Sequence, residues 1–335
     1  MRWAMLFALL PMVAGCRKDT PVALEESNTL FALEVAPGMP YPPLRDDNPL
    51  TDASVRLGRK LFFEPRLSRN GTIACGSCHF PERAFSDTIP RSLGVDGSPG
   101  LRNAPPLFDL AYHTAYFRDG GVPSLELQVL APIHDPMEMD YNINVAADIL
   151  DVEEPFHSLS RLAYGRGLDG YVITRAIANY ERTLLSGWSR YDRYLQGDAS
   201  ALSDQEVQGM LVFQGEAAGC THCHSGPDLS DHSYQNIGQY VDYADPGRER
   251  ITLAPSDLGK FKVPSLRNVA LTAPYMHDGA MGTLDEVVDF FIAGGEAHPN
   301  KSPWVHPLDL SEDERADLLA FLRALNDERP LDQVP

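Results

Sequence analysis

The chain has 335 residues and a formal net charge of −19 at neutral pH, with 47 acidic against 28 basic side chains. This acidic balance argues against nucleic acid as a partner, and against attachment to anionic lipids through basic patches. The length suits two domains, since domains usually have about 100–200 residues each.

The first 16 residues have the features of a secretory signal: Arg2, a short apolar run, and small residues before Cys16. A cysteine at this place resembles the lipobox of bacterial lipoproteins. We therefore predict a lipoprotein-type signal peptide over residues 1–16 with lipidation of Cys16; an ordinary cleaved signal is the alternative. The apolar run is too short to cross a membrane, so we expect a protein of the periplasm or cell envelope that is bound to a membrane only through its lipid. The proline-rich residues 17–48 are predicted to form an extended tether.

Five later stretches carry the signs of helices. Apolar residues recur at helical spacing from Val55 and within Asp169–Leu185, and capping boxes start at Ser203, Thr283 and Ser311. No stretch alternates apolar and polar residues over the length of a strand. Gly, Pro and Asp are dense between the predicted helices, which indicates long irregular loops.

Two pentapeptides carry the strongest functional signal, because residues 75–79 and 220–224 both read Cys-x-x-Cys-His. This is the attachment signature of c-type haem: the thiols add to the haem vinyl groups and the His ligates iron from one face. A thioredoxin-like redox pair does not require the following His, and a four-Cys zinc site normally uses a tighter spacing of its second pair. The sequence therefore predicts two covalently bound haems, held by Cys75, Cys78, His79, Cys220, Cys223 and His224.

Two haems would supply much of the apolar core in a chain with so many loops. We therefore expect a mainly α fold made of two cytochrome c-like haem domains with long irregular loops. The N-terminal haem domain is placed at residues 49–190 and the C-terminal one at residues 191–330.

Further motifs flank both pentapeptides: Leu61–Ser68, Arg102–Pro105, Arg118–Gly120, Lys260–Asn268 and Thr272–Gly279. Together they resemble the bacterial dihaem cytochrome c peroxidase superfamily, which includes the MauG-type enzymes that mature protein-derived cofactors. The resemblance runs from about Asn48 to Asp327 in matching order and spacing. It implies that hydrogen peroxide meets the N-terminal haem and that electrons enter at the C-terminal haem.

The resemblance also implies a distal Gln and Glu with a Pro between them, which match Gln128, Pro132 and Glu138. Heterolytic cleavage of peroxide needs a proton to move from one oxygen to the other, and one positioned carboxylate can accept and then deliver it. Glu138 is the expected acid–base residue. Gln128 would then fix a distal water or the peroxide.

Members of the family hold one Ca²⁺ between their domains, through an Asn side chain and two backbone carbonyls. Those positions match Asn103, Thr272 and Pro274, and oxygen donors of this type suit a hard cation. The resemblance thus implies a calcium ion here. The alternative is that Asn103 caps a turn and the two carbonyls face solvent.

Two positions depart from the family pattern around the first haem. Cytochrome c peroxidases of the family carry a His that blocks the peroxide site at rest, but Arg91–Pro99 contains none. MauG-type enzymes also lack this block, so we expect the first haem to be open. The Trp that the family places between the haems maps to Arg118, which puts electron hopping through that side chain in doubt.

A third departure concerns the second haem, whose outer ligand is Met or Tyr in the family. The matching residue is Phe291, which cannot bind iron. Either this haem is open, or Met276, Met281 or His298 supplies the ligand.

The leading hypothesis is a dihaem peroxidase that reduces hydrogen peroxide to water with electrons from a small redox protein, a cytochrome c or a cupredoxin. The first alternative is a MauG-like enzyme that oxidises side chains of a partner protein. The second is a non-catalytic dihaem electron-transfer cytochrome. The family often forms dimers, so a homodimer is a candidate assembly.

Overall fold

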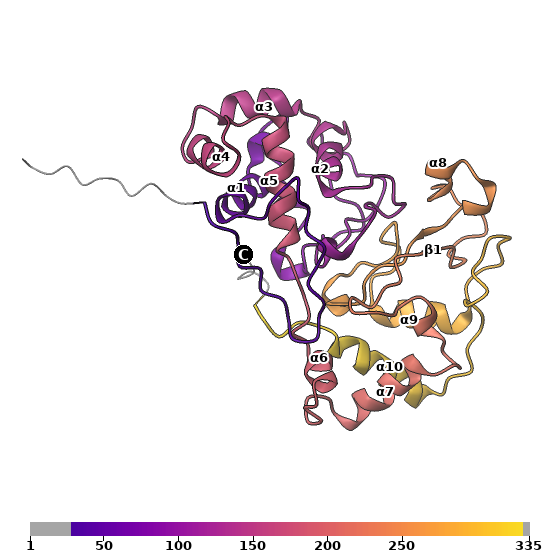
Figure 1. Ribbon diagram of the computed structural model, residues 1–335. Helices are drawn as coiled ribbons and strands as arrows, with labels where there is room; N and C mark the ends of the chain where they lie inside the picture. Colours follow the sequence, from indigo (N-terminus) through magenta and orange to yellow (C-terminus); the bar gives the residue numbers. More distant parts are fainter. Residues whose placement is uncertain (1–27, 331–335) are drawn as a thin grey trace, which may run out of the picture.

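The computed structural model describes residues 28–330 of the chain. They form two helical bodies that lie side by side, and the end of the described chain returns to the first body (Figure 1). Two separate clusters of buried apolar side chains form the cores, one built from residues between Leu50 and Leu184 and the other from residues between Tyr191 and Leu325. The buried residues of each cluster lie within one of the ranges predicted for the two domains, 49–190 and 191–330, whose bounds stay a prediction.

The N-terminal body consists of the helices α1 (Asp52–Phe62), α2 (Leu125–His134), α3 (Ile143–Leu150), α4 (Phe156–Tyr164) and α5 (Gly170–Arg182). Helix α5 is buried in the middle, and α1 packs closely along it. The contact requires a glycine, because a Cβ on Gly58 would lie 1.9 Å from the carbonyl oxygen of Ala176.

The C-terminal body contains α6 (Arg190–Leu195), α7 (Asp204–Gln214), α8 (Glu249–Thr252), α9 (Leu284–Ala293) and α10 (Glu312–Ala324). Helices α7 and α10 form its closest pair, and again a glycine allows it: a Cβ on Gly209 would lie 1.9 Å from the oxygen of Asp317. Two-residue antiparallel strands, β1 (Tyr234–Gln235) and β2 (Phe261–Lys262), form the small sheet of the described residues.

Short 3-10 turns connect many of these elements: Pro65–Leu67, Cys75–Ser77, Pro81–Arg83, Leu110–Tyr112, Cys220–His222, Pro255–Asp257 and Val269–Leu271. The mainly helical class is therefore confirmed, with long loops between the helices. The capping boxes at Ser203, Thr283 and Ser311 form as predicted, and Asp169 caps α5. Helices α2, α3, α4, α6 and α8 were not among the predicted ones.

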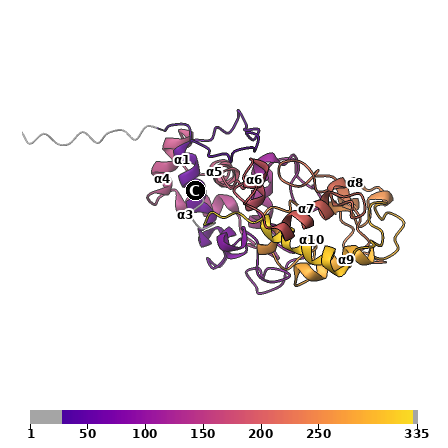
Figure 2. The same ribbon diagram turned by 90° about the horizontal axis from the view of Figure 1, so that it is seen from below.

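Residues 28–48 differ from the free tether that their composition predicts. They contain no helix, but Ala36 and Asn48 are buried. The carbonyl of Pro40 accepts a hydrogen bond from Tyr112 of the N-terminal body, and that of Pro37 accepts one from Gln196, just after α6. Figure 2 shows this indigo trace running from α1 towards α6. We call residues 28–48 the N-terminal strap, because they are fixed to both bodies.

The predicted signal peptide and Cys16 lie outside the described residues. Within residues 28–330, no helix is long and apolar enough to cross a membrane.

Candidate haem and peroxide sites

The first pentapeptide folds as a 3-10 turn that brings its cysteines and histidine together. The N–H of His79 donates to the oxygen of Cys75 at 3.0 Å, and the Nδ1 of His79 lies 2.7 Å from the oxygen of Phe85. A carbonyl only accepts, so Nδ1 carries the ring proton and Nε2 keeps its lone pair. Burial lowers the pKa of His79, which favours the neutral imidazole that binds iron.

The second pentapeptide repeats this geometry in the C-terminal body. The N–H of His224 donates to the oxygen of Cys220 at 2.9 Å, and the Nδ1 of His224 lies 3.2 Å from the oxygen of Leu229. Burial lowers the pKa of His224 as well. The four cysteines of the pentapeptides are free thiols, so both sites fit covalent haem with His79 and His224 as iron ligands.

Helix α2 and the turn after it position the predicted distal residues. Gln128 lies on α2, half-buried, and its side-chain amide has no hydrogen-bond partner within residues 28–330. The helix ends at His134, and the chain then turns back so that the N–H of Met139 donates to the oxygen of Pro132. Met139 is buried and fixes the turn on which Glu138 stands.

Solvent reaches the Glu138 side chain, but protein atoms surround much of its carboxyl group. The resulting desolvation, with a smaller contribution from Asp135, raises the pKa of Glu138 to about 7. The charge of Glu138 also contributes to the raised pKa of both thiols of the first pentapeptide, Cys75 and Cys78, after the larger effect of their burial. The fold thus brings Glu138 to the first pentapeptide.

The loop without a blocking histidine lies directly against this turn. Its Val95 N–H donates to the oxygen of Glu138 at 2.8 Å, and a Cβ on Gly94 would lie 2.1 Å from the oxygen of Met137. A side chain on this loop therefore lies next to Glu138. Because Arg91–Pro99 contains no histidine, the loop places no imidazole beside Glu138.

A second carboxyl near the first pentapeptide was missed in the sequence. Glu181 lies on α5, is buried, and has no hydrogen-bond partner for its Oε2 among the described residues. Burial raises its pKa to about 8, and its charge acts on the thiol of Cys75. The sequence did contain one sign of this residue, because a glutamate interrupts the apolar pattern of the helix predicted at Asp169–Leu185.

One of the predicted calcium donors, Asn103, does not fit a calcium ion as it stands. Asn103 is buried, and its Oδ1 accepts a hydrogen bond of 2.6 Å from Nη2 of Arg118. The Nε of Arg118 also donates to the backbone oxygen of Asn103 at 3.0 Å. A calcium ion at this oxygen would lie next to the guanidinium, and a charge of +2 and a charge of +1 repel by about 8 kcal/mol at 4 Å near a protein surface. The expectation of calcium at Asn103, Thr272 and Pro274 is revised accordingly.

The residues considered at the outer face of the second haem lie on α9 and on the loops before and after it. Phe291 lies on α9 with its ring packed against Phe290. Met276 and Met281 lie on the loop before α9, and their sulfurs have no hydrogen bond within residues 28–330. His298 accepts two hydrogen bonds at Nδ1, so the proton of its neutral ring is on Nε2 and must leave before that atom can bind a metal.

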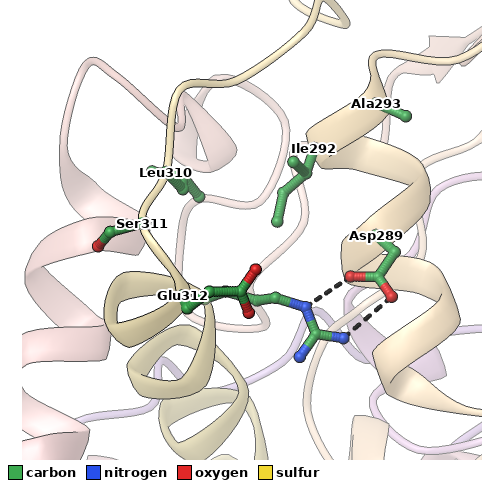
Figure 3. A pocket seen from close by; sticks show the side chains of 7 residues that line it. Asp289, Ile292, Ala293, Leu310, Ser311 and Glu312 are labelled. Atoms are coloured by element: carbon green, nitrogen blue, oxygen red, sulfur yellow. Dashed lines mark hydrogen bonds and ion pairs between the residues drawn. The ribbon is translucent and has the colours of Figure 1, made fainter.

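A surface cavity of about 470 Å³ lies between α9 and the start of α10 (Figure 3). Its cationic side chain, Arg315, is already paired with Asp289, and its other charged residue is Glu312. None of the predicted site residues lines it, so we assign it no ligand.

Comparison with known proteins identifies the family. The family model of the di-haem cytochrome c peroxidases matches residues 52–200. The methylamine utilization protein MauG of Methylorubrum extorquens is 40% identical over 287 residues, which cover 84% of this chain and 80% of that protein. The chain belongs to the dihaem cytochrome c peroxidase and MauG superfamily. This confirms the resemblance found in the sequence.

Two further relatives agree with this assignment. Cytochrome c551 peroxidase of Nitrosomonas europaea is 33% identical and covers 90% of this chain, with 88% of its own length matched. The crystal structure of a MauG-like protein associated with microbial copper homeostasis superposes with a TM-score of 0.86 at 35% identity, over 90% of this chain and 97% of that one. Family membership implies two c-type haems and oxidoreductase chemistry. Since the relatives are named both as peroxidases and as MauG, membership alone does not choose between the two roles.

Proposed function

We propose that this protein is a dihaem peroxidase that converts hydrogen peroxide, two protons and two electrons into two molecules of water. The observation that carries the proposal is the position of Glu138: a carboxyl with a pKa of about 7 lies beside the first pentapeptide, next to a loop that carries no blocking histidine. At neutral pH this group is present in both its charged and its neutral form, as an acid–base residue should be.

The side chains around the first pentapeptide have separate tasks in this proposal. The haem bound to His79 supplies the redox chemistry. The contact with the oxygen of Phe85 orients the His79 ring. Glu138 accepts a proton from one oxygen of peroxide and returns it to the other, and the free amide of Gln128 holds the peroxide or a water molecule by hydrogen bonds.

Electrons enter at the second pentapeptide, from a cytochrome c or a cupredoxin. The net charge of −19 would steer a basic donor towards the protein. A guanidinium is not a redox group, so the proposed electron path does not pass through Arg118. Calcium has no place in the proposal, because Arg118 binds the oxygen of Asn103. We place the protein in the periplasm or cell envelope, anchored through Cys16, as a candidate homodimer.

A second candidate function is MauG-like oxidation of a partner protein. The 40% identity to MauG and the absence of His from Arg91–Pro99 favour it. Phe291 and Arg118 oppose it, because MauG-type enzymes have Tyr and Trp at these positions. A non-catalytic electron-transfer cytochrome would leave the raised pKa of Glu138 without a role.

Peroxide turnover with a reduced cytochrome c separates the three functions. We expect the holoenzyme to consume one peroxide for every two donors oxidised. Peroxide consumption that depends on a partner protein, with a mass change in that partner, would instead support the MauG-like role. Electron exchange with the donor and no reaction with peroxide would leave only the electron-transfer cytochrome.

A further inference from the structure

Three side chains that the proposed function does not use meet where the two bodies touch. His113 follows the 3-10 turn Leu110–Tyr112 of the N-terminal body, whereas Asp228 and His232 belong to the segment after the second pentapeptide. One oxygen, Oδ2 of Asp228, lies 3.5 Å from Nε2 of His113 and 3.3 Å from Nε2 of His232. The metal-binding atoms of all three lie within 4.8 Å of one another.

Both contacts are longer than ordinary charge-assisted hydrogen bonds. Nε2 of His113 and Oδ2 of Asp228 are both buried, and neither has a hydrogen-bond partner in the described part of the chain. Charge-assisted hydrogen bonds between such groups are usually shorter, at about 2.7–2.9 Å. Asp228 is only 3% exposed, so solvent does not satisfy its carboxylate either. Buried polar atoms without partners are rare in native proteins and call for an explanation such as an ion.

The two distances from Asp228 to the histidines fit tetrahedral coordination. In a tetrahedron the distance between two ligand atoms is about 1.63 times the bond length, and zinc binds imidazole nitrogen and carboxylate oxygen at about 2.0–2.2 Å. Ligand atoms are then about 3.3–3.6 Å apart, which matches the two distances around Oδ2 of Asp228. Imidazole with carboxylate suits zinc and similar transition metals better than calcium or magnesium.

We propose that His113, Asp228 and His232 bind a divalent transition-metal ion of the zinc class, with a water molecule as fourth ligand. The ion is additional to the two haem irons. It joins the two bodies, because His113 comes from one and the other two ligands from the other.

Lys262 on β2 orients the histidine of the N-terminal body. Its Nζ lies 3.0 Å from Nδ1 of His113 and donates to the oxygen of Ala115 at 2.8 Å. When Lys262 donates to Nδ1, the proton of the neutral ring is on Nε2, which faces Asp228. The bound ion takes the place of this proton, and the proton leaves to solvent.

Zinc is the probe, and the test uses the untagged holoenzyme with both haems attached. After removal of loosely bound metals and equilibration with Zn²⁺, we expect one zinc and two irons per chain by elemental analysis. Zinc-edge X-ray absorption should show nitrogen and oxygen ligands at about 2.0–2.1 Å with the pattern of two imidazoles. The melting temperature should rise with zinc, because the ion binds only the folded arrangement.

The variants His232→Asn and Asp228→Asn should weaken zinc binding by more than the roughly 10–100-fold cost of losing an outer-shell partner. The chain offers a matched control in His157, which lies 3.2 Å from Asp151 but has no second histidine in that contact. His157→Asn should leave zinc binding unchanged. Haem absorption spectra of each variant check that it is folded.

Two results would overturn the proposal. One is a parent protein that takes up no stoichiometric zinc, or whose zinc spectrum shows no imidazole; this result does not depend on any variant. The other is a His157→Asn variant that loses as much zinc as His232→Asn.

Discussion

Beside the first pentapeptide lie two carboxyl groups with a raised pKa, Glu138 and Glu181, whereas the acids whose charges act on the second pentapeptide are the buried Asp228 and the exposed Asp231. The backbones of the two pentapeptides are nearly the same. Each pentapeptide forms a 3-10 turn, and Nδ1 of each histidine donates a hydrogen bond to a backbone carbonyl a few residues later. The attachment sequence therefore equips both sites to hold haem in the same way. What each haem does depends on side chains that come from elsewhere in the chain.

The largest expected effect tests the acid beside the first pentapeptide. Glu138→Gln keeps the volume of the side chain and removes its titrating proton, so peroxide turnover should fall by ~100-fold or more with both haems still attached. Glu153→Gln, an exposed glutamate paired with Arg66 in the same body, is the control and should keep the parent rate. A Glu138→Gln variant as fast as the parent would remove Glu138 from the mechanism.

The pH dependence of peroxide turnover should report the titration of Glu138. Glu138 must be a carboxylate to accept a proton, so turnover should fall by about tenfold per pH unit as the pH drops below about 7 and level off above it. The raised pKa also means that the stability contributed by the protonated form is lost as the pH rises through about 7. Steady-state rates of the parent and of Glu138→Gln check this, and the variant should lack the step near 7.

The absence of a blocking histidine predicts how the resting enzyme behaves. The oxidised protein should react with peroxide at once, because Arg91–Pro99 brings no ligand to the first haem. Stopped-flow mixing of the fully oxidised protein with peroxide measures this. An enzyme that stays inert until it receives an electron would show that another residue closes the site.

The next prediction concerns the second pentapeptide and the outer ligand of its haem. We expect it to be low-spin with a substitute ligand, because an open second iron would also consume peroxide. Electron paramagnetic resonance of Met276→Leu, Met281→Leu and His298→Asn should show the low-spin signal lost in one variant, with the other two as controls. A parent protein without any low-spin signal would mean that Phe291 covers an open site.

The smallest expected effect concerns calcium. Because the Arg118 guanidinium binds Asn103, adding Ca²⁺ to metal-free buffer should leave peroxide turnover unchanged. An increase of turnover on calcium addition would show that the ion displaces Arg118.

Local signals in the sequence were sufficient for the pentapeptides and the capping boxes, since each is complete within a few residues. Helix α2 was missed because it carries Pro132 in its interior and has no clear apolar stripe. The close contact of Arg118 with Asn103 could not be predicted, although both residues had been singled out. Contacts of this kind depend on the path of the chain between the two residues.

The N-terminal strap and the proposed zinc site also depend on the path of the chain, so the sequence could not predict them. The strap is held in part through backbone carbonyls, such as those of Pro37 and Pro40, and carbonyls leave no trace in a sequence. His113 and Asp228 are far apart in the chain and belong to different bodies. Only the fold brings them together.

The N-terminal strap also sets how far the enzyme could stand from a membrane. If Cys16 carries a lipid, a free chain over residues 17–48 would allow a distance of about 110 Å, at about 3.3–3.6 Å per extended residue. With residues 28–48 fixed to the protein, the chain between Cys16 and the strap can span at most roughly 40 Å. The two bodies would then lie close to the lipid surface. An electron donor would have to enter the space between the protein and the membrane, or approach from the side that faces away from the membrane.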